Sequence, residues 1–246
     1  IPERRGEDYK KFITAMKSLG YVFDSRELVA ADYGAPTTRK RWYAIFRRDG
    51  RDIVWPVQTH GKGGAGGLKP WEPIYKHLDL WDLGKSIFGR KKPLAENTMK
   101  RIARGLEKFV FNNPQPFIMK CYGGNYKGAG TGVDEPLRTV VTRDRFALVT
   151  VLGSEYVILD IFLRMLRPEE LKLGQGFPKD YVIDRDYMGH PYPASKQVAR
   201  IGNSVVPIMA EKLVGANCGY LKVGKRQPII QVKDFKAEAS GQMRFA

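Results

Sequence analysis

Near the amino terminus, hydrophobic and polar residues alternate with a helical period. In residues 6–20 apolar side chains recur every three or four positions, and the lysines fall on other faces. This pattern predicts an amphipathic helix. Glu7 and Asp8 in its first turn complement the helix dipole, and Gly20 suits the left-handed position after a last turn. The face expected to be buried consists of Tyr9, Phe12, Ile13, Met16 and Leu19.

The next two segments have the composition of β-strands. Residues 21–31 are rich in strand-forming side chains, and residues 41–48 carry apolar groups on both alternating faces. A strand of this kind is expected to be covered on both sides. Asp49 and Gly50 then predict a turn. The helix, strand, loop and strand together indicate the end of an α/β domain.

Irregular, helical and β-rich stretches follow. Residues 51–92 look irregular, and their Gly-rich run is expected to be a flexible loop that binds no nucleotide, because no strand leads into it and no helix follows. Residues 94–110 predict a helix that buries Ile102, Leu106, Phe109 and Val110 and leaves Lys100, Arg101, Arg104 and Lys108 mostly outside. Strands are expected within residues 117–122, 138–152 and 156–166, then a short helix from Pro168 and another over residues 195–217, interrupted near Gly202 and Pro207.

Composition narrows the class of protein. The chain has 246 residues, 43% of them hydrophobic and 28% charged, which is typical of a globular protein with a sizeable core. No apolar stretch is long enough to cross a membrane, and the charged start does not resemble a signal peptide. The two cysteines and three histidines do not have the spacing of a disulfide framework or a zinc site. We therefore expect a protein of the reducing cytoplasm that holds no metal.

Charge points to a polyanionic partner. The formal net charge is +16, and lysines and arginines that neutralise phosphates gain affinity by releasing counterions. A basic but merely solvated surface is the alternative. Charge alone does not distinguish DNA from RNA or from an acidic membrane.

One segment indicates a class of reaction through its resemblance to a known motif. Residues 31–43, ADYGAPTTRKRWY, resemble the eighth motif of DNA cytosine-5 methyltransferases, a Tyr-Gly-(apolar)-Pro-Gln-x-Arg-x-Arg run that opens a strand. Thr37 stands where the family usually has Gln. The resemblance implies that Arg39 and Arg41 are catalytic-site residues, one of which holds a flipped cytosine through its ring carbonyl. Two exposed strand arginines would be the alternative if this motif stood alone.

Two further motifs follow in the family's order. Residues 164–178 resemble the ninth motif, which mainly organises the recognition domain, although Arg167 and Glu169 depart from its usual Thr and Arg. Residues 201–207, IGNSVVP, resemble the tenth motif, Gly-Asn-Ser-Val-x-Pro. By this resemblance the tenth motif completes the wall of the S-adenosylmethionine pocket. The implied cofactor-binding residues are Gly202, Asn203, Ser204 and Val205.

Between the eighth and ninth motifs lie over a hundred residues, which in the family form the target-recognition domain. Residues 136–145, PLRTVVTRDR, look like its recurrent Pro-x-x-Thr-Val-x-(Thr/Ala)-Arg element. Thr139 would then contact the backbone near the flipped base. Arg143 and Arg145 are candidates for phosphates or guanine edges, although they could equally cap a strand.

The resemblance implies a fold and a division of the chain. We expect an α/β protein, made of the carboxyl-terminal part of a Rossmann-like S-adenosylmethionine-dependent methyltransferase domain and a β-rich target-recognition domain. The predicted segments are residues 1–50 (end of the catalytic domain), 51–194 (target recognition), 195–220 (a helix returning to the catalytic domain) and 221–246 (a basic tail).

The implied function is that of a DNA (cytosine-5-)-methyltransferase acting on double-stranded DNA. The family's nucleophilic Cys, its Glu-Asn-Val run and its Phe-x-Gly-x-Gly cofactor loop do not occur here, since neither Cys121 nor Cys218 follows a proline. We expect the chain alone to be inactive, with the nucleophile on a missing amino-terminal region or a separate chain. The alternatives are a non-enzymatic or degenerate DNA-binding module of this family and an RNA methyltransferase. The long recognition interval argues against the latter.

Overall fold

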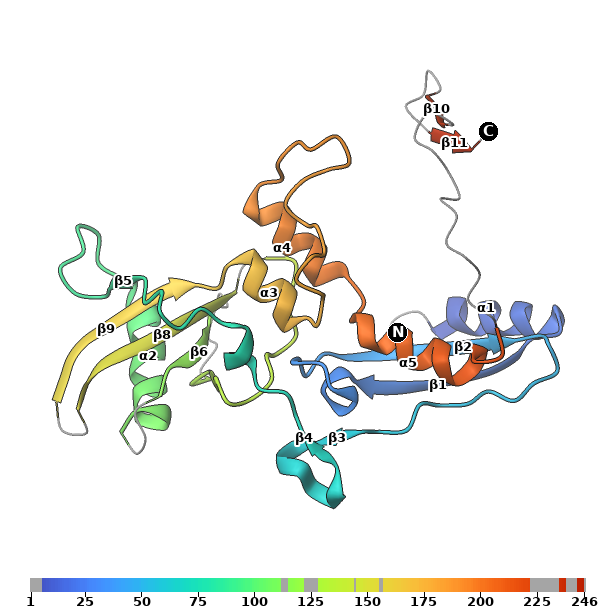
Figure 1. Ribbon diagram of the computed structural model, residues 1–246, viewed down its shortest axis with the longest axis horizontal. Helices are drawn as coiled ribbons and strands as arrows, with labels where there is room; N and C mark the ends of the chain where they lie inside the picture. The colour runs from blue at the N-terminus through green and yellow to red at the C-terminus, as the bar shows by residue number, and fades with distance from the viewer. Residues whose placement is uncertain are drawn as a thin grey trace.

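The computed structural model describes residues 6–111, 115–121, 128–143, 145–154 and 157–221, together with the backbone of two short strands in the tail. Two bodies lie side by side, one around a two-stranded sheet and one around a five-stranded sheet (Figure 1). The tail strands β10 (Phe235–Ala237) and β11 (Met243–Phe245) pair antiparallel. The rest of the predicted basic tail, from residue 222 on, lies outside the described residues.

The smaller sheet is covered on both faces, as its sequence predicts. β1 (Val22–Val29) and β2 (Lys40–Arg47) pair antiparallel, joined by the 3-10 turn η1 (Ala30–Tyr33) and the loop after it. Helix α1 (Gly6–Ser18) packs on one face through the ring pairs Tyr9–Trp42 and Phe12–Phe46. Helix α5 (Pro207–Cys218) contributes Met209 to the core of the other face, beside Tyr43. The predicted inner face of α1 is only partly covered, because Phe12 is 50% exposed.

The segment linking the two sheets is irregular, as expected, but it is tied to η1. Its short elements are β3 (His60–Gly61), η2 (Lys62–Gly67), β4 (Lys69–Pro70) and η3 (Ile74–His77). Asp32 accepts hydrogen bonds from the Thr59 amide (3.0 Å) and from the Trp71 indole (3.0 Å). The Gly-rich run adopts positive φ at Gly63, Gly64, Gly66 and Gly67, so it turns sharply between these anchors.

The larger sheet has the strand order β5-β9-β8-β6-β7. Its strands are β5 (Lys85–Ser86), β6 (Phe117–Lys120), β7 (Thr131–Gly132), β8 (Phe146–Ser154) and β9 (Val157–Met165), all paired antiparallel. Alternation along β6 sends Phe117 and Met119 to one face and Ile118 to the other. Both faces of this sheet are therefore packed.

Helices cover the two faces. Helix α2 (Glu96–Phe109) packs Ile102 against the Phe117 face, and α3 (Pro168–Gly174) and α4 (Ala194–Asn203) pack Leu171, Val198 and Ile201 against the other. Arg101, expected on the outside of α2, is instead buried. It lies one residue from Ile102 on the side that meets the sheet. Gly105 permits this close approach, because a Cβ there would lie 2.1 Å from the Phe117 ring.

The predicted helix over residues 195–217 is broken where expected. It divides into α4 and α5, and the break spans residues 204–206. The buried side chains of α4 belong to the core of the five-stranded body, and α5 makes the return to the two-stranded sheet. The expected division of the chain at residues 194 and 195 stays a prediction.

One strand starts later than its sequence suggests. Strand character was expected from Arg138, but β8 begins at Phe146. Residues 137–142 instead lie outside the sheet, where Leu137 bonds to the loop before β2 and the backbone of Val141 and Thr142 lies close to Gly202 near the end of α4. These contacts form the candidate site described below.

Candidate functional site

Three segments that are distant in sequence meet at one place, which we call the junction. It consists of Thr37–Arg39 before β2, Leu137–Thr142 before β8, and Gly202 near the end of α4. Thr37 and Leu137 form a parallel bridge, in which the Thr38 amide donates to the Leu137 carbonyl and the Leu137 amide to the Pro36 carbonyl, each at 2.8 Å. Thr37 is fully buried, so its short side chain fills this bridge.

Arg39 is the central side chain of the junction. Its Nη1 donates to the Val140 carbonyl at 3.0 Å, and its Nη2 donates to the Gly202 carbonyl at 2.9 Å. Only 5% of the residue is exposed. Burial, with the nearby charge of Arg41, lowers the pKa of Arg39 from its ordinary value. A guanidinium remains charged under such shifts and presents several donors in a fixed fork, so Arg39 ties the other two segments to β2.

Gly202 is required by the same contact. A Cβ there would lie 2.4 Å from the carbonyl carbon of Val141 and 2.6 Å from the Thr142 amide nitrogen. The absence of a side chain at Gly202 therefore permits this close backbone approach. The backbone that approaches belongs to this chain's own residues Val141 and Thr142.

Arg41 occupies a different environment although it is only two residues away. It is exposed, and its Nη1 donates to the Lys40 carbonyl at 2.8 Å. It lies on the same side of β2 as Tyr43, whose pKa is raised by burial. Of the two arginines expected in the catalytic site, only Arg41 presents its guanidinium to solvent. Their catalytic roles stay predictions.

The predicted cofactor residues lie at the turn between α4 and α5. The Ser204 hydroxyl donates to the Ile201 carbonyl at 2.7 Å and accepts from Nε2 of Gln175 at 3.3 Å. Gln175 is fully buried, so it joins the end of α3 to this turn. Asn203 and Val205 are exposed, which leaves one amide and one apolar side chain of this turn open to a ligand.

The predicted DNA-binding residues lie on and beside the junction. Thr139 is half-buried within it, next to the Val140 carbonyl that Arg39 holds. Arg143 follows it and is exposed. Arg145 is half-buried, and its Nη1 donates to the Cys121 carbonyl at 3.0 Å. This contact gives Arg145 a structural role in the chain, and DNA binding by the three residues stays a prediction.

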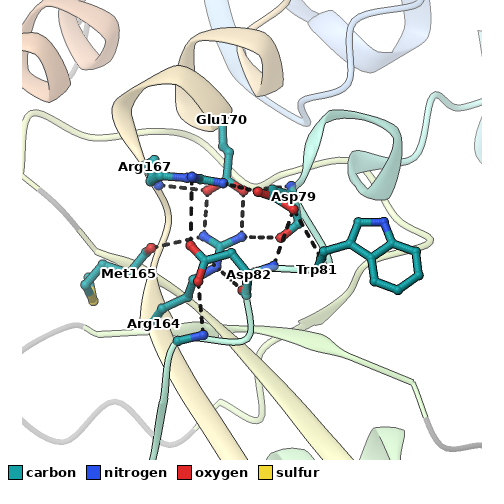
Figure 2. Close-up of polar contacts among 8 residues, drawn as sticks. Asp79, Trp81, Asp82, Arg164, Met165, Arg167 and Glu170 are labelled. Atoms are coloured by element: carbon teal, nitrogen blue, oxygen red, sulfur yellow. Dashed lines mark hydrogen bonds and ion pairs between the residues drawn. The ribbon is translucent and has the colours of Figure 1, made fainter.

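Sequence reasoning missed a buried ion pair in the body around the five-stranded sheet. The Arg164 guanidinium binds both carboxylate oxygens of Glu170 at 2.7 Å and also donates to the carbonyls of Asp79 and Asp82 (Figure 2). Glu170 accepts in addition from the amides of Asp79 and Arg167. The signal was present in the run RMLRPEE, where a Glu three residues after a helix start can bond back to the chain.

The loop held by this pair displays an exposed indole. The Asp79 carboxylate accepts from the amide of Trp81 at 3.1 Å and from Nη2 of Arg167 at 2.7 Å. Trp81 points away from the cluster and is 96% exposed (Figure 2). Burial would raise the pKa of Glu170, but its bonds from Arg164, Arg167 and Asp79 lower it below the ordinary value.

Metal ligands and membrane spans are not found in the part of the chain that the structure describes. No group of three or more His, Cys, Asp or Glu residues there could hold an ion. Within the same residues, no helix is both long and apolar enough to cross a membrane.

Comparison with known proteins places these features in a family. The chain matches the family described as C-5 cytosine-specific DNA methylase over residues 1–217. The type II methyltransferase M1.HphI of Haemophilus parahaemolyticus is 25% identical over 217 residues, which are 86% of this chain and 52% of that protein. The type II methyltransferase M.SacI of Streptomyces achromogenes is 38% identical over 52 residues, 21% of this chain and 13% of that protein. The chain thus spans about half the length of M1.HphI, and its match to M.SacI covers a smaller part of that protein.

Two solved methyltransferase structures also match the chain at low identity. The methyltransferase EhMeth of Entamoeba histolytica gives a TM-score of 0.45 at 16% identity, covering 87% of this chain and 59% of that one. The Dnmt2 methyltransferase of S. pombe gives 0.48 at 12% identity, covering 85% and 62%. Because the family match covers most of the residues, including all three segments of the junction, the chain belongs to the C-5 cytosine-specific DNA methylase family.

Proposed function

We propose that this chain is the carboxyl-terminal part of a DNA (cytosine-5-)-methyltransferase. It would read double-stranded DNA and complete the active site for methyl transfer to carbon 5 of cytosine. One observation carries the proposal: Arg39 binds the recognition segment at Val140 and the cofactor-side turn at Gly202 with a single buried guanidinium. Target reading and cofactor binding would therefore depend on the same contacts.

Arg41 is the residue of this chain proposed to touch the substrate. A target base must leave the stack before an enzyme can act on its ring, and an exposed guanidinium beside the junction can hold the ring carbonyl of an extruded cytosine. Thr139 would contact the adjoining DNA backbone. Arg143 and Arg145 are proposed to contact a phosphate or a guanine edge.

S-adenosylmethionine is the proposed cofactor, and it would supply the methyl group. The turn between α4 and α5 fits part of such a site, because Asn203 offers an exposed amide and Val205, 58% exposed, offers an apolar surface. Gln175 would position the turn through Ser204. Gly202 faces the recognition segment, so we assign it a positioning role beside the cofactor.

The two-stranded sheet is proposed to belong to a larger Rossmann-like sheet.

A Cys thiolate that adds to carbon 6 of the base would make carbon 5 reactive in nucleophilic catalysis. We propose that this Cys lies on an amino-terminal region or a separate chain, since Cys121 and Cys218 both lie at the ends of packed elements, after β6 and in α5.

The test uses the complete enzyme, reassembled from this chain and the part that carries the nucleophile. Arg41→Ala should lower single-turnover methylation far more than duplex affinity, because its contact forms only after the base leaves the stack. Arg41→Lys should restore little, because one ammonium cannot reproduce the planar fork. Arg48→Ala removes an exposed charge from just beyond the same strand and serves as the control. Near-normal turnover in Arg41→Ala would contradict the assignment.

The alternative is a non-enzymatic DNA-binding module of this family. The contacts of Arg39 favour this alternative, because its guanidinium donates to carbonyls of the chain itself. Transfer of labelled methyl groups to DNA by the reassembled protein would exclude this alternative. Binding without transfer, from a protein whose cysteine and cofactor motifs are intact, would support it.

A further inference from the structure

A pocket lies beside the junction, between α4 and the loop of residues 177–193. Its volume is about 300 Å³, and its walls are formed by three aromatic rings, two arginines and aliphatic side chains. The rings are those of Phe177, Tyr181 and Tyr192, and the arginines are Arg185 and Arg200. None of the residues that line it carries a carboxylate, so the pocket combines π surfaces with positive charge.

The loop that forms the pocket is held in place by its own hydrogen bonds. Lys172, only 2% exposed, donates to the carbonyls of Lys179 and Tyr181 at 2.7 and 3.0 Å. The Tyr192 amide donates to the Asp184 carbonyl at 2.6 Å, and Nε2 of Gln197 on α4 donates to the Tyr192 carbonyl at 2.8 Å. The aromatic walls are therefore fixed relative to α4 before any ligand binds.

The polar groups of the wall select an anion. The Arg200 guanidinium lies 3.6 Å from the centre of the Tyr192 ring, and its Nη1 makes only a long bond of 3.4 Å to the Lys196 carbonyl. Its other donors can reach a ligand anion. The Arg185 guanidinium, which also lines the pocket, is half exposed and 3.9 Å from the Asp184 carboxylate. A stacked guanidinium with free donors is suited to a phosphate beside a ring.

From these features we propose that the pocket binds a single nucleotide, with its base among the aromatic rings and its phosphate on Arg200. Its volume is at the small end of ligand sites and suits one nucleotide. Base stacking on aromatic side chains, combined with arginine contacts to the backbone, is how proteins hold unpaired nucleotides. The source would be an unpaired nucleotide of a DNA strand or a free mononucleotide, and the two present the same chemistry.

S-adenosylmethionine does not fit this pocket, although Ser204 forms part of its wall. The Ser204 hydroxyl is already used by Ile201 and Gln175. The sulfonium and ammonium groups of that cofactor would face two guanidinium groups, and like charges at close range repel. The inferred site is therefore independent of the proposed methyl transfer.

The first experiment measures binding of deoxyadenosine 5′-monophosphate to the 246-residue chain by equilibrium dialysis. Deoxyadenosine and deoxyribose 5-phosphate, which each lack one half of the ligand, should bind more weakly by about tenfold or more. S-adenosylmethionine should not compete. Displacement by S-adenosylmethionine, or failure of the mononucleotide and of an unpaired oligonucleotide to bind saturably, would overturn the proposal.

Matched variants locate the site. Arg200→Gln should weaken the mononucleotide about tenfold, whereas Arg51→Gln should not, although Arg51 is also stacked on a tyrosine, 3.3 Å from the Tyr220 ring. Tyr192→Ala should weaken it about tenfold, while Tyr192→Phe should retain it. Tyr187→Ala, in the same loop and 77% exposed outside the pocket, is the control for the tyrosine.

A short single-stranded oligonucleotide distinguishes the two sources. If the same variants weaken both the oligonucleotide and the mononucleotide, the pocket takes a nucleotide of a strand. If they weaken only the mononucleotide, it takes a free one. Equal affinity of wild type, Arg200→Gln and Tyr192→Ala for both ligands would show that binding occurs elsewhere and would end the proposal.

Discussion

At the scale of single residues, Arg39 and Arg41 show how two identical side chains two positions apart come to lie in different environments. Arg39 directly precedes β2 and Arg41 lies near its start, yet Arg39 is 5% exposed and bonded to two carbonyls of distant segments, and Arg41 is exposed. The motif spacing predicts their common side. It does not reveal that one of them closes the junction.

Replacing Arg39 by Ala should destabilise the chain. It leaves the carbonyls of Val140 and Gly202 without their donors in a buried place, and each unsatisfied group costs about 1–3 kcal/mol. We expect a loss of about 2–4 kcal/mol in the free energy of unfolding, measured by urea denaturation followed by circular dichroism. Arg41→Ala, the matched control, should change it by less than about 0.5 kcal/mol. Equal stability of the two variants would mean that Arg39 does not hold the junction.

A second prediction compares two glycines of the neighbouring helices. Gly202→Ala places a methyl group 2.4 Å from the Val141 carbonyl carbon, whereas Gly215→Ala on α5 meets nothing within 4 Å. Overpacking against backbone should cost about 3 kcal/mol or more, and the Gly215 variant should be neutral or gain up to about 1 kcal/mol from helix propensity. Thermal unfolding of both variants checks this. A Gly202→Ala chain as stable as wild type would contradict the close approach.

At the scale of elements, the pair Arg164–Glu170 connects β9, α3 and the loop at Asp79. The Arg164 side chain is 8% exposed and the Glu170 side chain 5%, so the pair is desolvated and its bonds must be complete to be tolerated. They are complete, since the carboxylate and guanidinium bind backbone groups on both sides. The pair thus links three elements of the body around the five-stranded sheet.

Stability should therefore fall in acid through this pair. The pKa of Glu170 in the folded chain is lowered below its unfolded value, so its contribution is present above about pH 4.3 and is lost as the pH falls through the folded pKa. Glu170→Gln leaves Arg164 buried without its counter-charge and should cost about 3–5 kcal/mol at neutral pH. Denaturation between about pH 3 and 7 should show a shallower acid loss in this variant than in wild type. Parallel curves would exclude the pair as the acid-sensitive group.

At the scale of the whole molecule, the full chain of 246 residues carries a formal net charge of +16. We expect affinity for duplex DNA to be dominated by phosphate contacts. With roughly six such contacts, the association constant should fall about a thousandfold between about 50 and 200 mM salt. A titration at several salt concentrations measures the slope, and affinity that does not change with salt would contradict this account.

Variants of Arg143 and Arg145 test which part of the DNA these residues contact. Arg143→Ala or Arg145→Ala should weaken binding uniformly across DNA sequences if the residue contacts phosphate. If it reads a base, the loss should be about 1–3 kcal/mol and confined to the preferred site. Arg145→Ala should also lower stability, because it removes the bond to the Cys121 carbonyl. Arg143 makes the cleaner test because its side chain is exposed.

Local sequence determined the elements whose signals are local. The amphipathic period of residues 6–20, the two-faced strand at 41–48, Pro168 as a helix start and the break near Pro207 all correspond to observed elements. The motif order also led to the family, which the match over residues 1–217 establishes. These features depend on side-chain period and on backbone restrictions of Gly and Pro, which neighbouring residues are sufficient to specify.

Tertiary structure decided the rest. Residues 138–145 have strand composition, yet β8 begins only at Phe146, because Leu137 pairs with Thr37 and the backbone at Val141 packs against Gly202. Likewise Arg101, expected on the outside of its helix, is buried, and Arg39, expected in a catalytic site, bonds to the chain's own carbonyls. Burial of a charge depends on acceptors supplied by residues far away in the chain, and for Arg39 these lie 101 and 163 positions away. No local pattern contains that information.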